Sequence, residues 1–216
     1  MRHAIFASFA CLSLAACGGD GGLVDNSTPD EIQTLSATDL ARRTGATYRR
    51  VTSLPGTAFV AMPTSGVATF DGLGTVAVDP DSADAIAVVG DAAMTVDFGA
   101  RTLRGRIDGL RGLQGDRIAD VREVPVDGAI TIGGRSAIGQ GAPNDASVRY
   151  RGDMTFADGR TLDVRGRLDG KFRGTMASKA GTPDAPRALN LGDGSPRLTD
   201  GAGRRIPGIV AVAVEN

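Results

Sequence analysis

The chain has 216 residues, a formal net charge of −1, one histidine, two cysteines and no tryptophan. Its basic residues form isolated pairs without interleaved aromatic residues, which argues against a nucleic-acid-binding protein. The single histidine, His3, lies in an N-terminal segment that we expect to be removed, so catalysis or metal binding through histidine is excluded. We therefore predict no enzymatic activity, no metal site and no cofactor.

Residues 1–16 have the features of a secretory signal peptide. Arg2 provides a short basic region, and the apolar stretch from Ile5 to Ala16 is too short to span a bilayer. The sequence Leu14-Ala15-Ala16-Cys17 resembles a bacterial lipoprotein cleavage box, which implies cleavage before Cys17 and attachment of acyl chains such as palmitate to it. Two or more acyl chains anchor a protein stably to a membrane. Gly18, in place of an aspartate after the cysteine, favours the outer membrane.

Two segments follow before the main domain. Residues 17–28 are rich in glycine and aspartate and are predicted to form a flexible tether. Residues 29–64 are predicted to form a helical or irregular lead-in, since Thr28-Pro29-Asp30-Glu31 fits a capping box with proline at the first helical position. With Gly45 as the expected stop signal, we predict one or two short helical turns between Pro29 and Thr44.

Residues 65–216 show the pattern of a β-barrel domain. From Ala92 to Leu110, apolar and polar residues alternate on both sides of a short break, as expected for a hairpin with one buried face. The same design returns between Met154 and Gly170. Seven or eight short strands without a long amphipathic helix predict an all-β fold. The apolar strand Ile206 to Val214 favours closure, which removes exposed edges. We predict a small antiparallel barrel of about eight strands.

The second hairpin also predicts a register. Leu162, Val164 and Leu168 share one face, and a three-residue loop Asp158-Gly159-Arg160 keeps them in phase while providing a glycine for positive φ. Opposite charges then face each other across the strands, each pair contributing about 0.2–1 kcal/mol. The predicted pairs are Asp153 with Arg165, and Arg149 with Asp169.

Two segments are predicted to be long loops that bind a partner. Residues 109–126 are rich in glycine and charge, and residues 177–205 contain several prolines and glycines. Loops of this length are uncommon unless they are functional or disordered. The charges of the first loop would provide electrostatic specificity. The candidate partner residues are Arg111, Asp116, Arg117, Arg122 and Glu123.

Three segments carry a resemblance to a known family. They are Gly66-Val67-Ala68-Thr69-Phe70-Asp71-Gly72, Met94-Thr95-Val96-Asp97-Phe98 and Gly170-Lys171-Phe172-Arg173-Gly174. In this order, and behind a lipoprotein cleavage box, they resemble the small β-barrel lipoproteins related to the barrel domain of transferrin-binding protein B. The resemblance implies a cell-surface lipoprotein with a ligand-binding barrel. Arg205 to Val210 departs from the Gly-Gly-x-aromatic strand that ends the family's barrels, and transferrin binding is not implied.

Together these features predict a lipid-anchored bacterial cell-envelope lipoprotein. Its barrel would be a non-catalytic binding module, held at the membrane through Cys17 and open to a protein partner through its loops. Two alternatives stay open: a lipocalin-like barrel that carries a small apolar ligand, and an envelope-structural lipoprotein without a ligand. Inward-facing glycines such as Gly105 and Gly166 leave room either for bulky neighbours or for a cavity.

Overall fold

The computed structural model describes residues 29–115, 117–135, 138, 142, 144–175 and 186–216. The predicted signal peptide, the tether and Cys17 lie outside these residues. The elements follow in chain order: η1 (Pro29–Thr34), α2 (Ala37–Ser53), η2 (Phe59–Ala61), β1 (Val67–Val78), β2 (Ile86–Asp97), β3 (Thr102–Gln114), η3 (Ile118–Asp120), β4 (Arg122–Arg135), β5 (Asp145–Phe156), β6 (Thr161–Arg173), β7 (Ala188–Asp193), β8 (Arg197–Asp200), β9 (Arg205–Ile206) and β10 (Gly208–Glu215).

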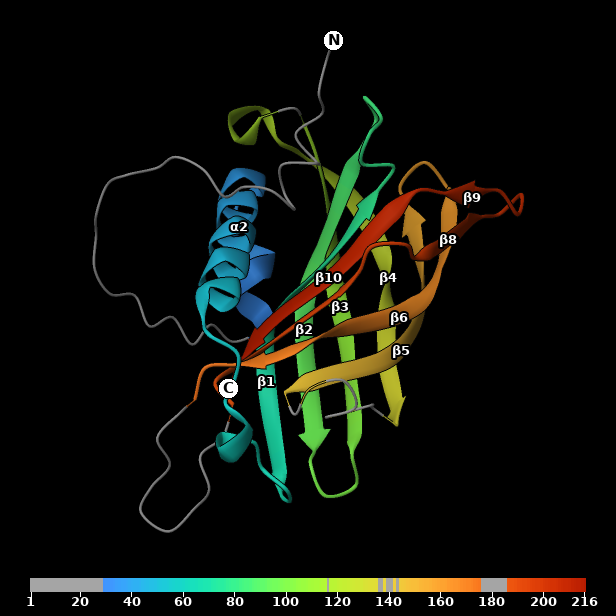
Figure 1. Cartoon of the computed structure of the whole chain (residues 1–216). Coiled ribbons are helices and arrows are strands. Elements are labelled where there is room, and N and C mark those ends of the chain that lie inside the picture. Colours follow the sequence, from blue (N-terminus) through green and yellow to red (C-terminus); the bar gives the residue numbers. More distant parts are fainter. Residues whose placement is uncertain (1–28, 116, 136–137, 139–141, 143, 176–185) are drawn as a thin grey trace.

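Eight strands close into an antiparallel barrel (Figure 1). Strands β1 to β6 form a meander in which each strand pairs with the next. β7 pairs with β6 and β10, and β10 returns to β1 with a register from Asp71↔Glu215 to Val78↔Gly208. β8 and β9 form a hairpin beside β6. The predicted all-β barrel, and its closure by the last apolar strand, are both confirmed.

The interior of the barrel is filled by side chains from the predicted inward positions. The ring centroids of Phe98 and Phe172 lie 5.5 Å apart, and those of Phe70 and Phe172 lie 6.2 Å apart. Burial of one large apolar side chain contributes about 1.5–3 kcal/mol, so this alternation determines which face of each strand turns inward. Seven of the hairpin residues predicted to face inward are at most 2% exposed: Met94, Val96, Leu103, Ile107, Leu162, Val164 and Leu168. Phe98 is 5% exposed, Gly105 and Gly166 are half-buried, and Gly109, also predicted to face inward, is exposed.

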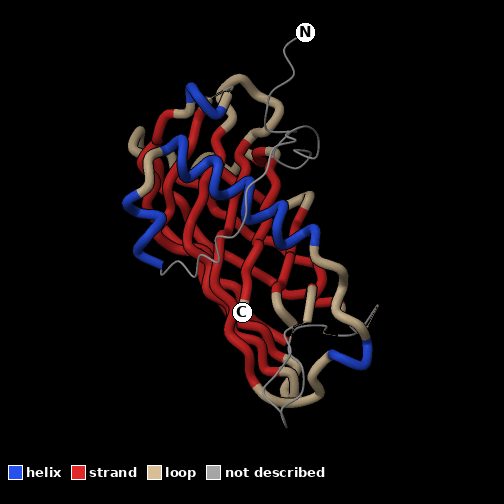
Figure 2. Tube along the Cα trace, turned by 90° about the vertical axis from the view of Figure 1, so that its left-hand side faces the viewer, coloured by secondary structure: helices blue, strands red, loops and turns tan. Residues whose placement is uncertain are grey.

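A helix covers one side of the barrel from outside (Figure 2). Leu40 of α2 belongs to an apolar cluster with outward residues of β1 and β2, including Leu73 and Val89. Further along, Val51 packs with Ala188 of β7 and Ala213 of β10. The helices of the described residues are all too short or too polar to cross a membrane.

This helix is longer and starts later than predicted. The backbone amide of Asp39 donates to the side chain of Ser36 at 3.1 Å, so Ser36 is the N-cap, whereas Pro29 begins the 3₁₀ turn η1. The expected stop, Gly45, lies inside α2. A glycine in a helix interior costs about 1 kcal/mol relative to alanine. The buried stripe that continues through Thr47 and Val51 offsets this cost.

The register of the β5–β6 hairpin differs from the prediction by two residues. The backbone amide of Phe156 donates to the carbonyl of Arg160 at 2.9 Å, so the loop is Ala157–Gly159 rather than 158–160. Gly159, with a φ of 82°, takes the third loop position, where three-residue hairpins need a left-handed residue. A shift of two leaves the inward face unchanged but replaces the predicted opposite-charge pairs. The observed pairs are Asp153↔Asp163, Arg151↔Arg165 and Arg149↔Arg167.

The first of the two predicted long loops is largely strand, and the second is strand in part. In the segment 109–126, β3 continues to Gln114 and β4 already begins at Arg122, with the short turn η3 between them. Gly109, with a φ of 57°, lies at a β-bulge where the β2–β3 and β3–β4 registers shift, so its glycine signal marks a bulge and not a loop. The segment 177–205 contains β7 and β8, and its residues 177–185 lie outside the described residues.

Candidate anion-binding face

Arginines face each other across the outer surface of the β5–β6 hairpin. Arg149 pairs in register with Arg167, and Arg151 pairs with Arg165. All four side chains point outward because the inward positions of both strands are occupied by buried residues such as Val148 and Leu168. Like charges placed directly opposite each other destabilise a sheet, which makes their repetition in two successive pairs unusual for a purely structural surface.

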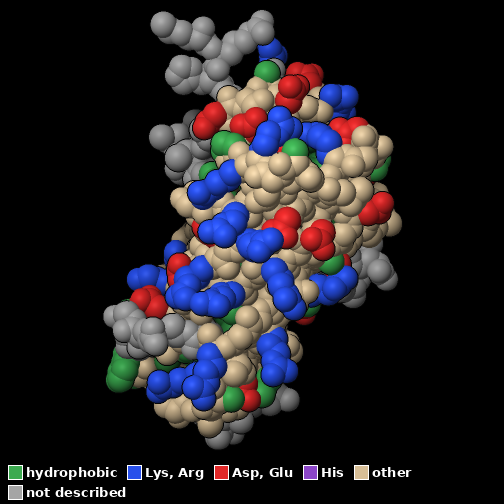
Figure 3. Space-filling view, turned by 90° about the vertical axis from the view of Figure 1, so that its right-hand side faces the viewer, with side chains coloured by type: hydrophobic (Ala, Val, Ile, Leu, Met, Phe, Trp, Pro, Cys, Tyr) green, Lys and Arg blue, Asp and Glu red, His purple; other side chains and the backbone are tan. Residues whose placement is uncertain are grey.

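The cluster extends beyond this hairpin. Arg197 of β8 pairs in register with Arg165, and Thr131 of β4 pairs with Arg151. A shallow depression of about 1080 Å³ lies on this wall, and its lining includes these arginines together with Arg205 of β9. Figure 3 shows Arg and Lys side chains gathered over this side of the molecule. We name this surface the arginine face and define it as Arg149, Arg151, Arg165, Arg167, Arg197 and Arg205.

Most of the arginine face lacks a neutralising partner. Arg165 pairs with Asp163 on its own strand at 2.6 Å, and hydrogen bonds and charge from Asp163 raise the pKa of Arg165. Arg167 donates to the hydroxyl of Ser147 at 3.3 Å. The side chains of the other four arginines of the face form no hydrogen bond or ion pair with the described residues. Their guanidinium groups therefore remain available for an external anion.

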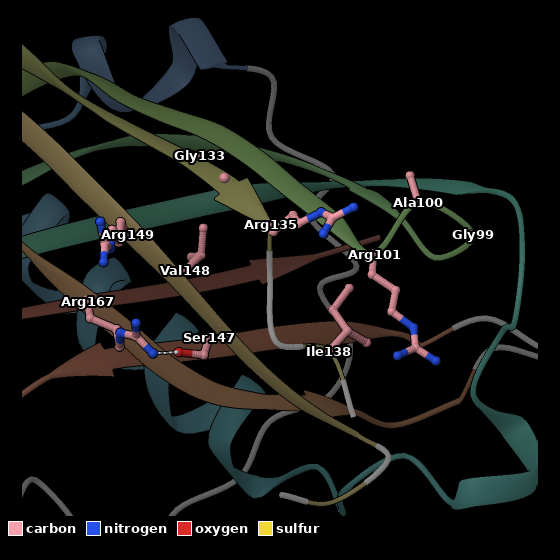
Figure 4. A pocket seen from close by; sticks show the side chains of 11 residues that line it. Gly99, Ala100, Arg101, Gly133, Arg135, Ile138, Ser147, Val148, Arg149 and Arg167 are labelled. Carbon is pink, nitrogen blue, oxygen red and sulfur yellow. Dashed lines mark hydrogen bonds between the residues drawn. The ribbon is translucent and has the colours of Figure 1, made fainter. Parts of the chain in front are cut away.

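The barrel wall opens beside the arginine face. β4 and β5 pair only from Val126↔Phe156 to Ile132↔Tyr150, and beyond that point they separate. A pocket of about 810 Å³ lies at the opening, lined by Ile138 and by arginines from both sides. Figure 4 shows Arg149 and Arg167 on one side and Arg101 and Arg135 on the other. The pocket shares Gly133, Arg149 and Arg167 with the depression of the arginine face, so the two form one cationic surface.

A buried tyrosine and a carboxylate lie beneath this surface. The hydroxyl of Tyr150 lies 3.0 Å from the carboxylate of Asp193, which also accepts backbone amides of Arg167 and Ser195 at 3.1 Å and 2.9 Å. Burial, followed by the charge of Asp193, raises the pKa of Tyr150, which keeps this hydroxyl protonated. The carboxylate is therefore held by these neutral donors, and it fixes the backbone under Arg167.

The described residues among those predicted to bind a partner lie elsewhere, on the β3–β4 side, and Arg111 and Glu123 pair with each other there. Arg111 is 7% exposed; it donates to Glu123 at 2.8 Å and 2.6 Å and to the carbonyl of Ile32 at 2.6 Å. Hydrogen bonds from Arg111 lower the pKa of Glu123. Arg111 is thus a structural clamp between the barrel and the lead-in, and it is not accessible to a partner.

The other described candidate residues of segment 109–126 contact residues that lie near them on the same side of the barrel. Arg122 donates to Gln114 at 2.6 Å, and the exposed Arg117 lies 4.0 Å from Asp120. Asp116 lies outside the described residues. The described candidates do not form a common site with the arginine face. They lie on β3 (Arg111), just before η3 (Arg117) and on β4 (Arg122 and Glu123).

The sequence contained a signal for the arginine face that the predicted register concealed. Arg149-Tyr150-Arg151 and Arg165-Gly166-Arg167 both place arginines at outward strand positions. The predicted register set aspartates opposite Arg149 and Arg165, which suggested a partly neutralised surface, and set Arg151 opposite Arg167. The observed register sets arginine opposite arginine.

Guanidinium groups bind phosphate, sulfate and carboxylate groups through two parallel hydrogen bonds. Within the described residues, no cluster of three or more histidine, cysteine, aspartate or glutamate side chains could hold a metal ion. Neither protein-family models nor curated proteins nor solved structures give a match to this chain. The chemistry of the arginine face is therefore the main guide to function.

Proposed function

We propose that this protein is a lipid-anchored lipoprotein of the bacterial outer membrane whose barrel is a non-catalytic binding module of the transferrin-binding-protein type. The lipoprotein cleavage box at Cys17 and the three resembling segments support this proposal. We further propose that the arginine face is the binding surface and that its ligand is an acidic polysaccharide.

One observation carries the assignment of the surface: arginine faces arginine in two successive cross-strand pairs. Such pairs oppose folding, so a surface that keeps them is best explained by an anion that neutralises them in the bound state. The lining of the depression consists of the six arginines of the arginine face together with Thr131, Gly133, Tyr150, Gly166, Ser195 and the carboxylate of Asp193, which is held by neutral donors.

The composition of the face favours a polysaccharide over other polyanions. Protein interfaces depend on buried aromatic anchors, and single-stranded nucleic acids stack on exposed aromatic rings. The aromatic residue in this lining is Tyr150, which is only 3% exposed and turned toward the interior. A chain of repeated carboxylate or sulfate groups needs no aromatic platform and matches an extended row of guanidinium groups.

The test measures binding of heparin, a sulfated polysaccharide, to the full chain and to Arg149→Glu and Arg151→Glu. Loss of a charged hydrogen bond costs about 1.5–3 kcal/mol, so each variant should bind about ten- to a hundredfold more weakly. Arg49→Glu on α2, which makes the same charge change on the far side of the barrel, should bind like the unmodified chain.

A second readout separates binding from folding. Arg151→Glu places a carboxylate opposite Arg165, so the variant should be as stable as the unmodified chain or more stable by about 0.2–1 kcal/mol. Weaker heparin binding together with preserved stability supports the proposal. Equal losses of affinity in Arg151→Glu and Arg49→Glu would contradict it, because a general charge effect would then account for the binding.

A further inference from the structure

The exposed large hydrophobic side chains of the described residues gather in one short segment. They are Phe59, Val60 and Val67, which are 74%, 92% and 65% exposed. Isolated exposed apolar residues are normal on protein surfaces, but three of them within one short segment mark a contact surface. The segment is η2 together with its connection to β1.

Both ends of this segment are fixed to the same end of the barrel (Figures 1 and 2). The amide of Thr57 donates to the carbonyl of Phe172, near the end of β6, at 3.0 Å. The carbonyl of Gly66 accepts the amide of Phe98, just after β2, at 3.0 Å. Between these points Met62 packs against the interior core, while Phe59 and Val60 point away from it. The apolar side chains are therefore held outward by a fixed backbone.

Unpaired cations lie at the same end of the barrel. The last row of the register runs from Val67 through Asp97 and Thr102 to Arg135, and Arg101 lies in the adjoining β2–β3 turn. Arg101 and Arg135 are exposed, and neither side chain forms an ion pair or hydrogen bond with a described residue.

At the opposite end of β1 and β2, the loop that joins these two strands is acidic. The β1–β2 loop contains three carboxylates, Asp79, Asp81 and Asp84, of which the last two are exposed. The neighbouring turns at that end carry paired charges of both signs, such as Arg117 with Asp120 and Arg160 with Asp158. An anionic surface would therefore attract the η2 end, where Arg101 and Arg135 are unpaired, more strongly than the β1–β2 loop.

We infer that the η2 end of the barrel docks on the surface of an anionic phospholipid bilayer. Phe59 and Val60 enter the boundary between headgroups and acyl chains, and Arg101 and Arg135 contact headgroup phosphates. Exposed apolar side chains next to arginines, held at one end of a rigid fold, are the features of interfacial membrane binding, and anionic lipids attract such arginines. This inference does not depend on what the arginine face binds.

The absence of tryptophan from the chain allows a specific probe. Phe59→Trp places a single tryptophan at the docking end. Ala83→Trp places one at the opposite end of the barrel, in the exposed part of the acidic β1–β2 loop. The full chain is mixed with vesicles of phosphatidylglycerol and phosphatidylethanolamine that carry brominated acyl chains. The position 59 fluorophore should shift to shorter wavelength and be quenched. The position 83 fluorophore should do neither, even when the N-terminal segment itself holds the chain on the vesicle.

Two further comparisons test the partner. Replacing Arg101 and Arg135 by glutamine in the Phe59→Trp chain should reduce quenching on anionic vesicles and leave the weaker signal on phosphatidylcholine vesicles unchanged. Equal quenching at positions 59 and 83 would overturn the inference. So would a shift at position 59 that depends on protein concentration in the absence of lipid, because this segment would then be an interface between two copies of the chain.

Discussion

The guanidinium of Arg111 in β3 holds the carboxylate of Glu123 in β4 through two hydrogen bonds, at 2.8 Å and 2.6 Å. Its third nitrogen holds the carbonyl of Ile32, in the lead-in, at 2.6 Å. One side chain thus connects two strands of the barrel to the segment that precedes α2.

Glu123→Gln should destabilise the fold by about 1–3 kcal/mol, because it leaves a largely buried cation without its counter-charge. Arg111→Met should also detach the lead-in, which hydrogen exchange at residues 32–35 would report as faster exchange. Arg117→Gln is the control, since its partner lies 4.0 Å away and both side chains are largely exposed. Urea titration measures all three. If Glu123→Gln and Arg117→Gln cost the same, the clamp has no special role.

The same pair predicts a pH dependence. The pKa of Glu123 is lower in the folded chain than its ordinary value, so the pair stabilises the fold above the unfolded-state pKa, and this stabilisation is lost as pH falls through the folded-state pKa. The difference in unfolding free energy between the unmodified chain and Glu123→Gln should therefore shrink from about pH 7 to about pH 3. A difference that is constant across this range would show that the charge of Glu123 is not responsible.

Substitution of two neighbouring residues of β6 should destabilise the fold to very different extents. Leu162 is 1% exposed inside the barrel, so Leu162→Asp buries an unpaired charge and should cost several kcal/mol, on the order of 3–5. Asp163 points outward and pairs with Arg165, so Asp163→Leu should cost about 1 kcal/mol or less. Denaturant titration of the two variants tests which face of the strand is buried; similar costs would mean that neither face is.

Two strands approach each other so closely at one glycine that a larger residue there should destabilise the barrel. A Cβ at Gly170 in β6 would overlap the backbone carbonyl of Asn190 in β7, whereas a Cβ at Gly133 in β4 would have no neighbour within 4 Å. Gly170→Ala should therefore destabilise by about 1–3 kcal/mol, and Gly133→Ala by less than about 0.5 kcal/mol. Thermal unfolding of the pair measures the difference. Equal melting temperatures would show that β6 and β7 can separate without cost.

The anchor can be tested in bacterial cells. Cys17→Ser, or treatment with the signal-peptidase inhibitor globomycin, should leave an unacylated precursor of higher mass, because processing of a lipoprotein requires the modified cysteine. Mass spectrometry of the membrane fraction measures this. Normal processing of Cys17→Ser would mean that residues 1–16 act as an ordinary signal peptide and that the proposed anchor is wrong.

Alternation allowed the barrel and its inward residues to be predicted, because burial of residues such as Leu162 and Val164 outweighs every other preference of a strand. It could not determine the register of β5 and β6, because a shift of two residues preserves alternation. The position of Gly159 in the loop settles that shift, and with it the charge pattern of the outer wall. The sequence therefore carried the outward arginines of the arginine face, but their pairing as Arg149↔Arg167 and Arg151↔Arg165 follows only from the observed register.

Other differences have a similar origin. Gly109 and Gly45 are signals for a loop or a helix end when read locally, yet they lie in a bulge of β3 and in the interior of α2. In each case packing of distant residues overrides the local preference. Arg111 was predicted to be a loop charge for the same reason, since its partner Ile32 lies 79 positions away in the chain.

The seam of the barrel has a consequence for the order of folding. β1 closes against β10, which joins the earliest and latest strands of the domain, and such long-range pairing forms slowly. Until β10 is synthesised, β1 has an open edge that could recruit another polypeptide. α2 precedes β1 in the chain and contacts both β1 and β10. It can therefore cover the unpaired edge of β1 before β10 binds there. A chain truncated before β10 would form an open sheet with an unpaired, aggregation-prone edge strand, and not a smaller barrel.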